Sequence, residues 1–186
     1  MIRRILAIAT LLCITAMGLT TADNANAQSG FESAVAHVVN VLDADTIDVD
    51  YISGGEGLPT RLQMYAMNAP DYSPPGPFMA PFEECYGEEA RDIAIGLLMG
   101  NTIWISHQSL VTEVSLVDRL NAYVYLDSDK MSLYQAIMIS QGAAVRENLL
   151  PEEQFLFPRF IQLETEANAN DRGLWADCDP RLYQDR

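Results

Sequence analysis

The stretch Thr60–Asp71 reads TRLQMYAMNAPD and carries a strong strand signal. Apolar Leu62, Met64 and Ala66 alternate with polar residues, a pattern typical of a strand with one buried face. The alternation gives way to an Asn-Ala-Pro-Asp turn, so polar groups collect where the strand ends. The stretch therefore predicts a strand with a candidate site at its end.

A second polar turn, Asp43-Ala44-Asp45-Thr46, lies earlier in the chain and precedes the alternating run Ile47–Ile52. We expect the two turns to meet. Carboxylate and amide oxygens at adjacent strand ends suit a hard divalent cation, and a nearby arginine suits a phosphate. The pattern favours metal-assisted phosphodiester chemistry.

Together with the opening stretch, the rest of the chain predicts a total of five strands and three helices. Besides the opening stretch, strands are expected at residues 34–42, 47–52, 102–107 and 119–126, and helices at 83–99, 133–141 and 152–170. The first three strands should be antiparallel, because a glycine-rich hairpin at residues 53–57 joins the second to the third. This order fits an α+β fold, a five-stranded Greek-key barrel of the OB type with three α-helices, better than a sandwich.

Three further features have structural and functional interpretations. Prolines crowd residues 70–81, which predicts a long loop, either a functional flap with an apolar lid or a surface excursion without a role. His37 is expected to be a packed or hydrogen-bonded strand residue rather than a ligand, and Trp175 is expected to fill the core.

The N-terminus has the three parts of a secretory signal peptide. Arg3 and Arg4 precede the apolar run Ile5–Leu19, and Ala25-Asn26-Ala27 is a small-residue cleavage site. Cleavage after Ala27 would leave a single domain at residues 28–186 in a secreted or periplasmic protein without stable membrane association. An uncleaved anchor stays open as the alternative.

Cysteine usage agrees with export. Cys13 lies in the signal peptide, so the mature chain would keep only Cys85 and Cys178. An even pair in an oxidising compartment favours a disulfide, and two unpaired thiols are the alternative.

The chain is strongly acidic, with a formal net charge of −15, which becomes −16 when Arg3, Arg4 and Asp23 leave with the signal peptide. Tight binding to polymeric nucleic acid draws on many Lys/Arg–phosphate contacts, and Lys130 is the only lysine. The charge therefore disfavours nucleic acid and leaves a nucleotide, a small anion or an unknown protein as partners of an expected monomer. Adaptation to a salty medium is the alternative explanation.

Five motifs carry a resemblance to a known family. They are Val41–Thr46, similar to V-x-D-G-D-T; Tyr65–Asp71, similar to x-G-I/V-D-A/T-P-E; Cys85–Ala90, similar to Y-G-x-E-A; Asp118–Tyr125, similar to G-R-x-L-A-Y-V; and Gly173-Leu174-Trp175, similar to G-L/I-W. In this order they resemble the staphylococcal nuclease (thermonuclease) family, OB-type barrels with three helices that cleave DNA and RNA with calcium.

The resemblance implies a calcium site with one ligand charge fewer than the family's. The ligands would be the Asp45 carboxylate, the Asn68 side chain in place of an aspartate, and the Ala69 carbonyl. Calcium affinity follows ligand charge, so this site should be weak. The base would be Asp71, which is one methylene shorter than the family's glutamate.

The resemblance also implies a changed phosphate clamp. Arg119 matches one of the family's two arginines, whereas the other falls on uncharged Gln63, and Arg61 is a candidate substitute two residues away. The family's stacking tyrosines fall near Asn148 and Leu150. These departures predict calcium-dependent phosphodiester hydrolysis that is much weakened or lost; the alternative is a non-catalytic OB-fold module that binds a protein, peptide or small anion.

Overall fold

The computed structural model describes residues 31–73, 82–108, 119–147 and 156–179. The predicted signal peptide, the tip of the proline-rich loop, Asn148 and Leu150 lie outside the described residues. Across the described ranges, no helix combines the length and the apolar character needed to cross a membrane.

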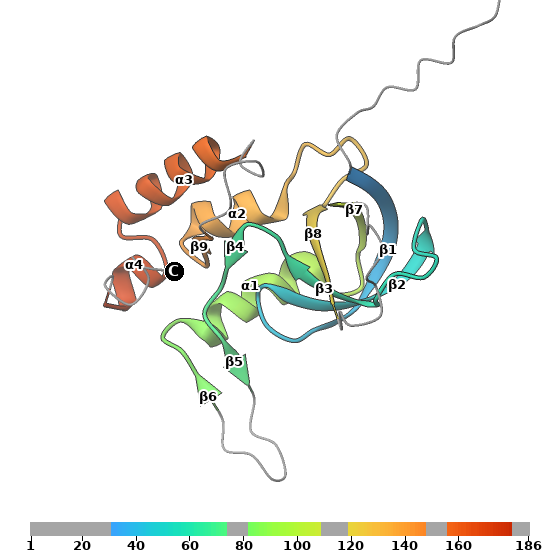
Figure 1. Ribbon diagram of the computed structural model, residues 1–186. Coiled ribbons are helices and arrows are strands. Elements are labelled where there is room, and N and C mark those ends of the chain that lie inside the picture. The colour runs from blue at the N-terminus through green and yellow to red at the C-terminus, as the bar shows by residue number, and fades with distance from the viewer. Residues whose placement is uncertain (1–30, 74–81, 109–118, 148–155, 180–186) are drawn as a thin grey trace, which may run out of the picture.

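Five strands close into a barrel in the order β1-β2-β3-β8-β7 (Figure 1). The pair β3 and β8 is parallel, and the other four pairs are antiparallel. The predicted five-stranded barrel and the antiparallel order of its first three strands are therefore confirmed. The bounds are Phe31–Val41 for β1, Thr46–Ser53 for β2, Arg61–Met64 for β3, Thr102–Gln108 for β7 and Leu120–Tyr125 for β8.

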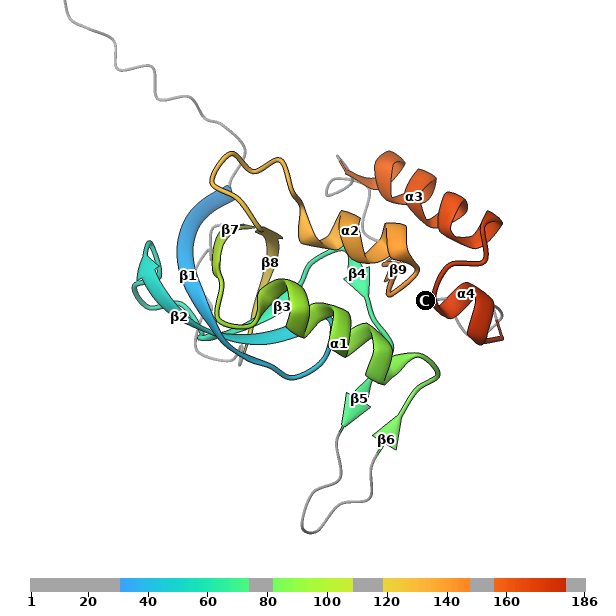
Figure 2. The same cartoon turned by 180° about the vertical axis from the view of Figure 1, so that it is seen from behind.

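Four helices accompany the barrel in the described part of the chain. Helix α1 (Gly87–Leu98) lies against the barrel and contacts β1, while α2 (Tyr134–Gln141) packs on β8 and against α3 (Phe157–Ala169). Figure 2 shows α3 and the short α4 (Leu174–Asp177) on the far side of α2 from the barrel. The sequence predicts three helices, and α4 is a fourth that was not predicted.

Helix α1 begins four residues later than predicted, at Gly87 instead of Glu83. Glu83 belongs to β6 (Phe82–Glu83), which pairs with β5 (Tyr72–Ser73), so the base of the proline-rich segment is a short ribbon where we predicted only irregular loop. Tyr86 then takes a left-handed conformation, with φ of 71°, that turns the chain into α1. A second ribbon pairs β4 (Met67–Asn68) with β9 (Val145–Arg146).

The core follows the predicted alternation in the opening stretch. Leu62 and Met64 are fully buried, whereas Arg61 is exposed and Gln63 half-buried. Trp175 is buried as predicted, but in a separate small cluster with Val145, Ala167 and Leu174 and outside the barrel core. His37 is exposed, with its Nδ1 3.0 Å from the Thr102 hydroxyl.

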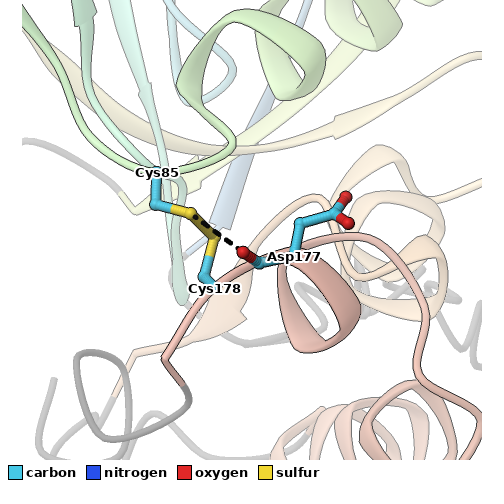
Figure 3. Close-up of a disulfide and its surroundings, with 3 residues drawn as sticks. All are labelled: Cys85, Asp177 and Cys178. Atoms are coloured by element: carbon cyan, nitrogen blue, oxygen red, sulfur yellow. Dashed lines mark hydrogen bonds between the residues drawn. A yellow bond between two sulfur atoms is a disulfide. The ribbon is translucent and has the colours of Figure 1, made fainter.

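The predicted disulfide is present. Cys85 and Cys178 are bonded across a sequence separation of 93 residues (Figure 3). Closing a loop of this length removes enough freedom from the unfolded chain to stabilise the fold by about 2–5 kcal/mol.

Candidate functional site

Strand pairing brings the polar residues into one line on the outside of the barrel. Thr46 of β2 pairs with Gln63 of β3, which pairs in turn with Asn121 of β8. Asp45 directly precedes β2, and its carbonyl accepts a 2.7 Å hydrogen bond from the Met64 amide. The register therefore fixes where these side chains meet.

A hydrogen-bonded row runs along this line. Arg119 donates from Nη1 to the Gln63 Oε1 at 2.6 Å. The Thr46 hydroxyl lies 3.1 Å from the same oxygen and 2.9 Å from Oδ1 of Asp45, and it donates its one proton to either. Two neutral side chains thus link the positive Arg119 to the negative Asp45.

Asp45 also joins the two polar turns. Its side chain is buried, at 5% exposure, and its Oδ2 accepts a 3.1 Å hydrogen bond from the Ala69 amide. Asn68 directly precedes Ala69 in the chain, belongs to β4 and is half-buried. The two turns that we expected to meet are therefore in contact through Asp45 and Ala69.

Asp43 is the most perturbed carboxyl of the site. Burial, the charge of Asp45 and a side-chain hydrogen bond with Asp45 raise the pKa of Asp43 to about 7, while the Asp45 amide donates to its Oδ1 at 3.1 Å. Two carboxyl groups thus lie close together in a partly desolvated turn. Such an arrangement favours either a shared proton or a cation.

Two helical side chains hold this turn by its carbonyl groups. Arg91 of α1 donates from Nε to the Leu42 carbonyl at 2.9 Å and from Nη2 to the Val41 carbonyl at 3.1 Å. The Tyr134 hydroxyl of α2 donates to the Ala44 carbonyl at 2.7 Å. Burial, and then the charges of Asp45 and Asp43, raise the Tyr134 pKa, so the phenol stays protonated. Sequence reasoning missed Arg91 and Tyr134, because bonds to backbone leave no spacing signal.

Two hollows flank the acidic turns. One, of about 390 Å³, is lined by Gln63, Asn68, Arg119, Asn121 and Glu147 among others. The other, of about 500 Å³, is lined by Asp43, Asp71 and Arg91 among others. The structure thus gathers Asp45, Asn68, Ala69, Gln63 and Arg119, and it places the exposed Asp71 in the neighbouring hollow beside Asp43.

Arg61 points to a different partner. Its Nε lies 2.8 Å from Oδ1 of Asp48, and its Nη2 lies 3.2 Å from Oδ2. This bidentate contact with Arg61 lowers the pKa of Asp48. The structure does not bring the Arg61 guanidinium to the Gln63 position.

The candidate metal ligands at the two turns are all oxygen atoms. Among the described residues, no group of three or more histidine, cysteine, aspartate or glutamate side chains is arranged to hold a metal ion. The mixed set of the Asp45 carboxylate, the Asn68 amide and the Ala69 carbonyl is nonetheless of the kind that hard cations take, with few ligand charges. Arg119 beside it offers donors to an anion.

Comparison with known families agrees with the barrel fold. The family model described as staphylococcal nuclease homologue matches residues 61–177, more than half of the chain. The match runs from β3 to α4 and includes Gln63, Asn68, Asp71 and Arg119. The chain matches no curated protein sequence. On the closed barrel and this match, the chain belongs to the family of staphylococcal nuclease homologues.

Proposed function

We propose that this protein is an exported, calcium-dependent phosphodiesterase with much weakened activity. The observation that carries the proposal is the 2.6 Å contact between Arg119 and Gln63. The retained arginine faces an amide oxygen at the position where the family has a second arginine. The site thus keeps one cation for the phosphate and lacks the other.

The residues at the two turns fit calcium as oxygen donors. Asp45, Asn68 and Ala69 would hold the ion, and the neighbouring Asp43 adds a second carboxyl whose pKa is raised because burial and Asp45 both disfavour its charge. Bound calcium would supply charge neutralisation at the phosphate. A neutral amide at Asn68 supports low affinity.

The chain's own groups have separate tasks in this proposal. Arg119 donates to the phosphate oxygens, where charge develops during hydrolysis, and Asp71 accepts a proton from the attacking water. Loss of one such positive donor costs on the order of 10²–10³-fold in rate. The shorter reach of Asp71, about 1 Å less than glutamate, costs up to another factor of about 10².

Charge argues for a short substrate. A net charge of −15 repels polymeric nucleic acid, and one phosphate at Arg119 needs few cationic contacts. We therefore propose a nucleotide-sized or short single-stranded substrate for a monomer that is secreted or periplasmic.

Calcium calorimetry on the mature chain tests the proposal. We expect binding in the range of about 0.1–5 mM, and we expect Asn68→Asp to tighten it about tenfold because it restores a ligand charge. Asp45→Asn serves as the control and should remove the binding heat. No heat from the wild type at millimolar calcium would count against a calcium enzyme.

A non-catalytic module that binds a protein, peptide or small anion is the second candidate. It is favoured by the Arg61–Asp48 ion pair, because Asp48 engages the guanidinium of Arg61 and so withholds that cation from a phosphate at the site. For this candidate we expect phosphate or peptide binding that is the same in calcium and in a chelator. Calcium-independent binding without any turnover would favour it over the enzyme.

A further inference from the structure

The segment that carries Asp71 is fastened through its backbone. The Glu84 amide donates to the Asp71 carbonyl at 2.9 Å, and the Asp71 amide donates to Oε2 of Glu84 at 3.3 Å. In the adjacent ribbon, Tyr72 pairs with Glu83. Asp71 and Glu84 thus form the inner end of the β5–β6 ribbon.

The start of α1 presses against the same backbone. A Cβ atom on Gly87 would lie 2.5 Å from the Asp71 carbonyl oxygen and 3.3 Å from the Tyr72 Cβ, so only glycine fits without movement. The Gly87 amide donates to the Glu84 carbonyl at 2.9 Å. Asp71 is therefore held between Glu84 and the first residue of α1.

The disulfide fixes the residue next to Glu84. Figure 3 shows Cys85 bonded to Cys178 at the end of α4, with the Cys85 Sγ 3.7 Å from the Asp177 carbonyl oxygen. Helix α4 is itself anchored, because its Leu174 and Trp175 are buried. The packing of α4 therefore fixes Cys178. Through the disulfide, Cys178 fixes the Glu84–Cys85 segment that contacts Asp71.

We propose that Glu84 and the Cys85–Cys178 disulfide act as a clamp that positions Asp71 for proton transfer, an inference that rests on the proposed function. The carboxylate of Asp71 is short, so its reach depends on where its backbone lies. A displacement of about 1 Å at a reacting group can lower the rate about 10²-fold. Glu84, Cys85 and Cys178 are positioning residues that act through Asp71.

A disulfide that only stabilises the whole fold is the competing explanation. It would raise the free energy of unfolding but leave the folded state unchanged, so exchange near Asp71 would follow global unfolding. The clamp instead predicts a local effect at Asp71.

Amide hydrogen exchange on the calcium-free mature chain separates the two explanations. Under the clamp, Cys85→Ala with Cys178→Ala speeds exchange at Asp71 more than at Val49 or Val124, whereas a purely global effect of the disulfide speeds all three alike. We expect Glu84→Ala to speed exchange at Asp71 about fivefold or more, because the acceptor for its amide is lost, with no change at Val49 or Val124 in the barrel. Glu84→Gln keeps a side-chain oxygen and should restore the wild-type rate. Glu88→Ala is the matched control, since it removes a nearby α1 charge and should change nothing. An unaltered Asp71 rate in Glu84→Ala would overturn the clamp.

Turnover tests the disulfide in a chain with Gln63→Arg and Asn68→Asp, which keeps Asp71. Adding Cys85→Ala with Cys178→Ala should lower kcat for single-stranded DNA about tenfold, with KM and calcium affinity within about twofold, well below the unfolding temperature. An unchanged kcat would overturn the role of the disulfide. If the parent chain does not cleave DNA at all, the proposed function fails, and the exchange result still decides the clamp.

Discussion

Folding changes the charge of Asp43 near neutral pH. Burial, and next the charge and side-chain hydrogen bond of Asp45, raise its pKa from 3.8 to about 7. The folded protein therefore binds more protons than the unfolded chain between these values. Its contribution to stability is fully present below the unfolded pKa and is lost as pH rises through the folded pKa.

This linkage predicts how Asp43→Asn behaves. In a chelator, the variant should gain about 1–3 kcal/mol in free energy of unfolding, relative to the wild type, between about pH 4 and about pH 8.5, after allowance for solvent screening. Urea denaturation at the two pH values measures the gain. A wild type and a variant that change in parallel with pH would show that Asp43 titrates normally.

Individual residues also show which parts of the site can be predicted from the sequence. The two polar turns follow from the local sequence pattern, because strand ends bring such groups together, whereas the choice of Asp45, Asn68 and Ala69 within them follows from the family resemblance. The pairing of Arg61 with Asp48 does not follow, because it depends on the cross-strand register of β2 and β3. Residues two apart on a strand share a face, but a side chain contacts the residue directly opposite it on the neighbouring strand. For Arg61 that residue is Asp48.

At the scale of elements, α2 and α4 pack together where Gly142 and Gly173 bring their backbones into close contact. Gly142 ends α2 with φ of 70°, and its carbonyl accepts a 2.9 Å hydrogen bond from the Leu174 amide. A Cβ on Gly142 would collide with the Arg172 carbonyl oxygen and lie 3.2 Å from Cδ1 of Trp175. This close approach of the α2 and α4 backbones fixes the position of α4 and of Cys178 at its end.

Gly142→Ala should therefore lower the free energy of unfolding by about 2–4 kcal/mol, from backbone strain and the clash. Gly96→Ala is the matched control. Gly96 lies in α1, and apart from its own helix backbone nothing lies within 4 Å of an added Cβ, so alanine should stabilise by about 0.5–1 kcal/mol. Chemical denaturation of both variants checks the opposite signs. Two changes of the same sign would contradict the docking role of Gly142.

Elements differ in how well their ends are predicted. The helical periodicity of α1 is clear, but its start is set by the left-handed Tyr86 and by the β5–β6 pairing, neither of which is a local preference of the sequence. The four-residue α4 is too short for a periodic signal, and it exists because Gly173 and the docking of Trp175 place it.

For the whole molecule, element order was enough to predict the barrel, because few folds accommodate a helix between the third and fourth strands of a five-stranded sheet. The distribution of polar groups was not predictable to the same degree. The row from Arg119 through Gln63 and Thr46 to Asp45 joins three strands, and Asp71 lines a separate hollow with Arg91. Such contacts depend on barrel closure and on packing of α1.

We propose that the site keeps calcium chemistry and lacks transition-state stabilisation at Gln63. The most direct measurement is the rate of calcium-dependent cleavage of single-stranded DNA by wild type and by Gln63→Arg with Asn68→Asp and Asp71→Glu. We expect little cleavage by wild type, a gain of about 10²-fold or more in the variant, and loss of that gain on adding Arg119→Ala, because each restored group acts on developing charge or on the proton. Brisk cleavage by wild type that Arg61→Ala abolishes would contradict the claim and place the second cation at Arg61.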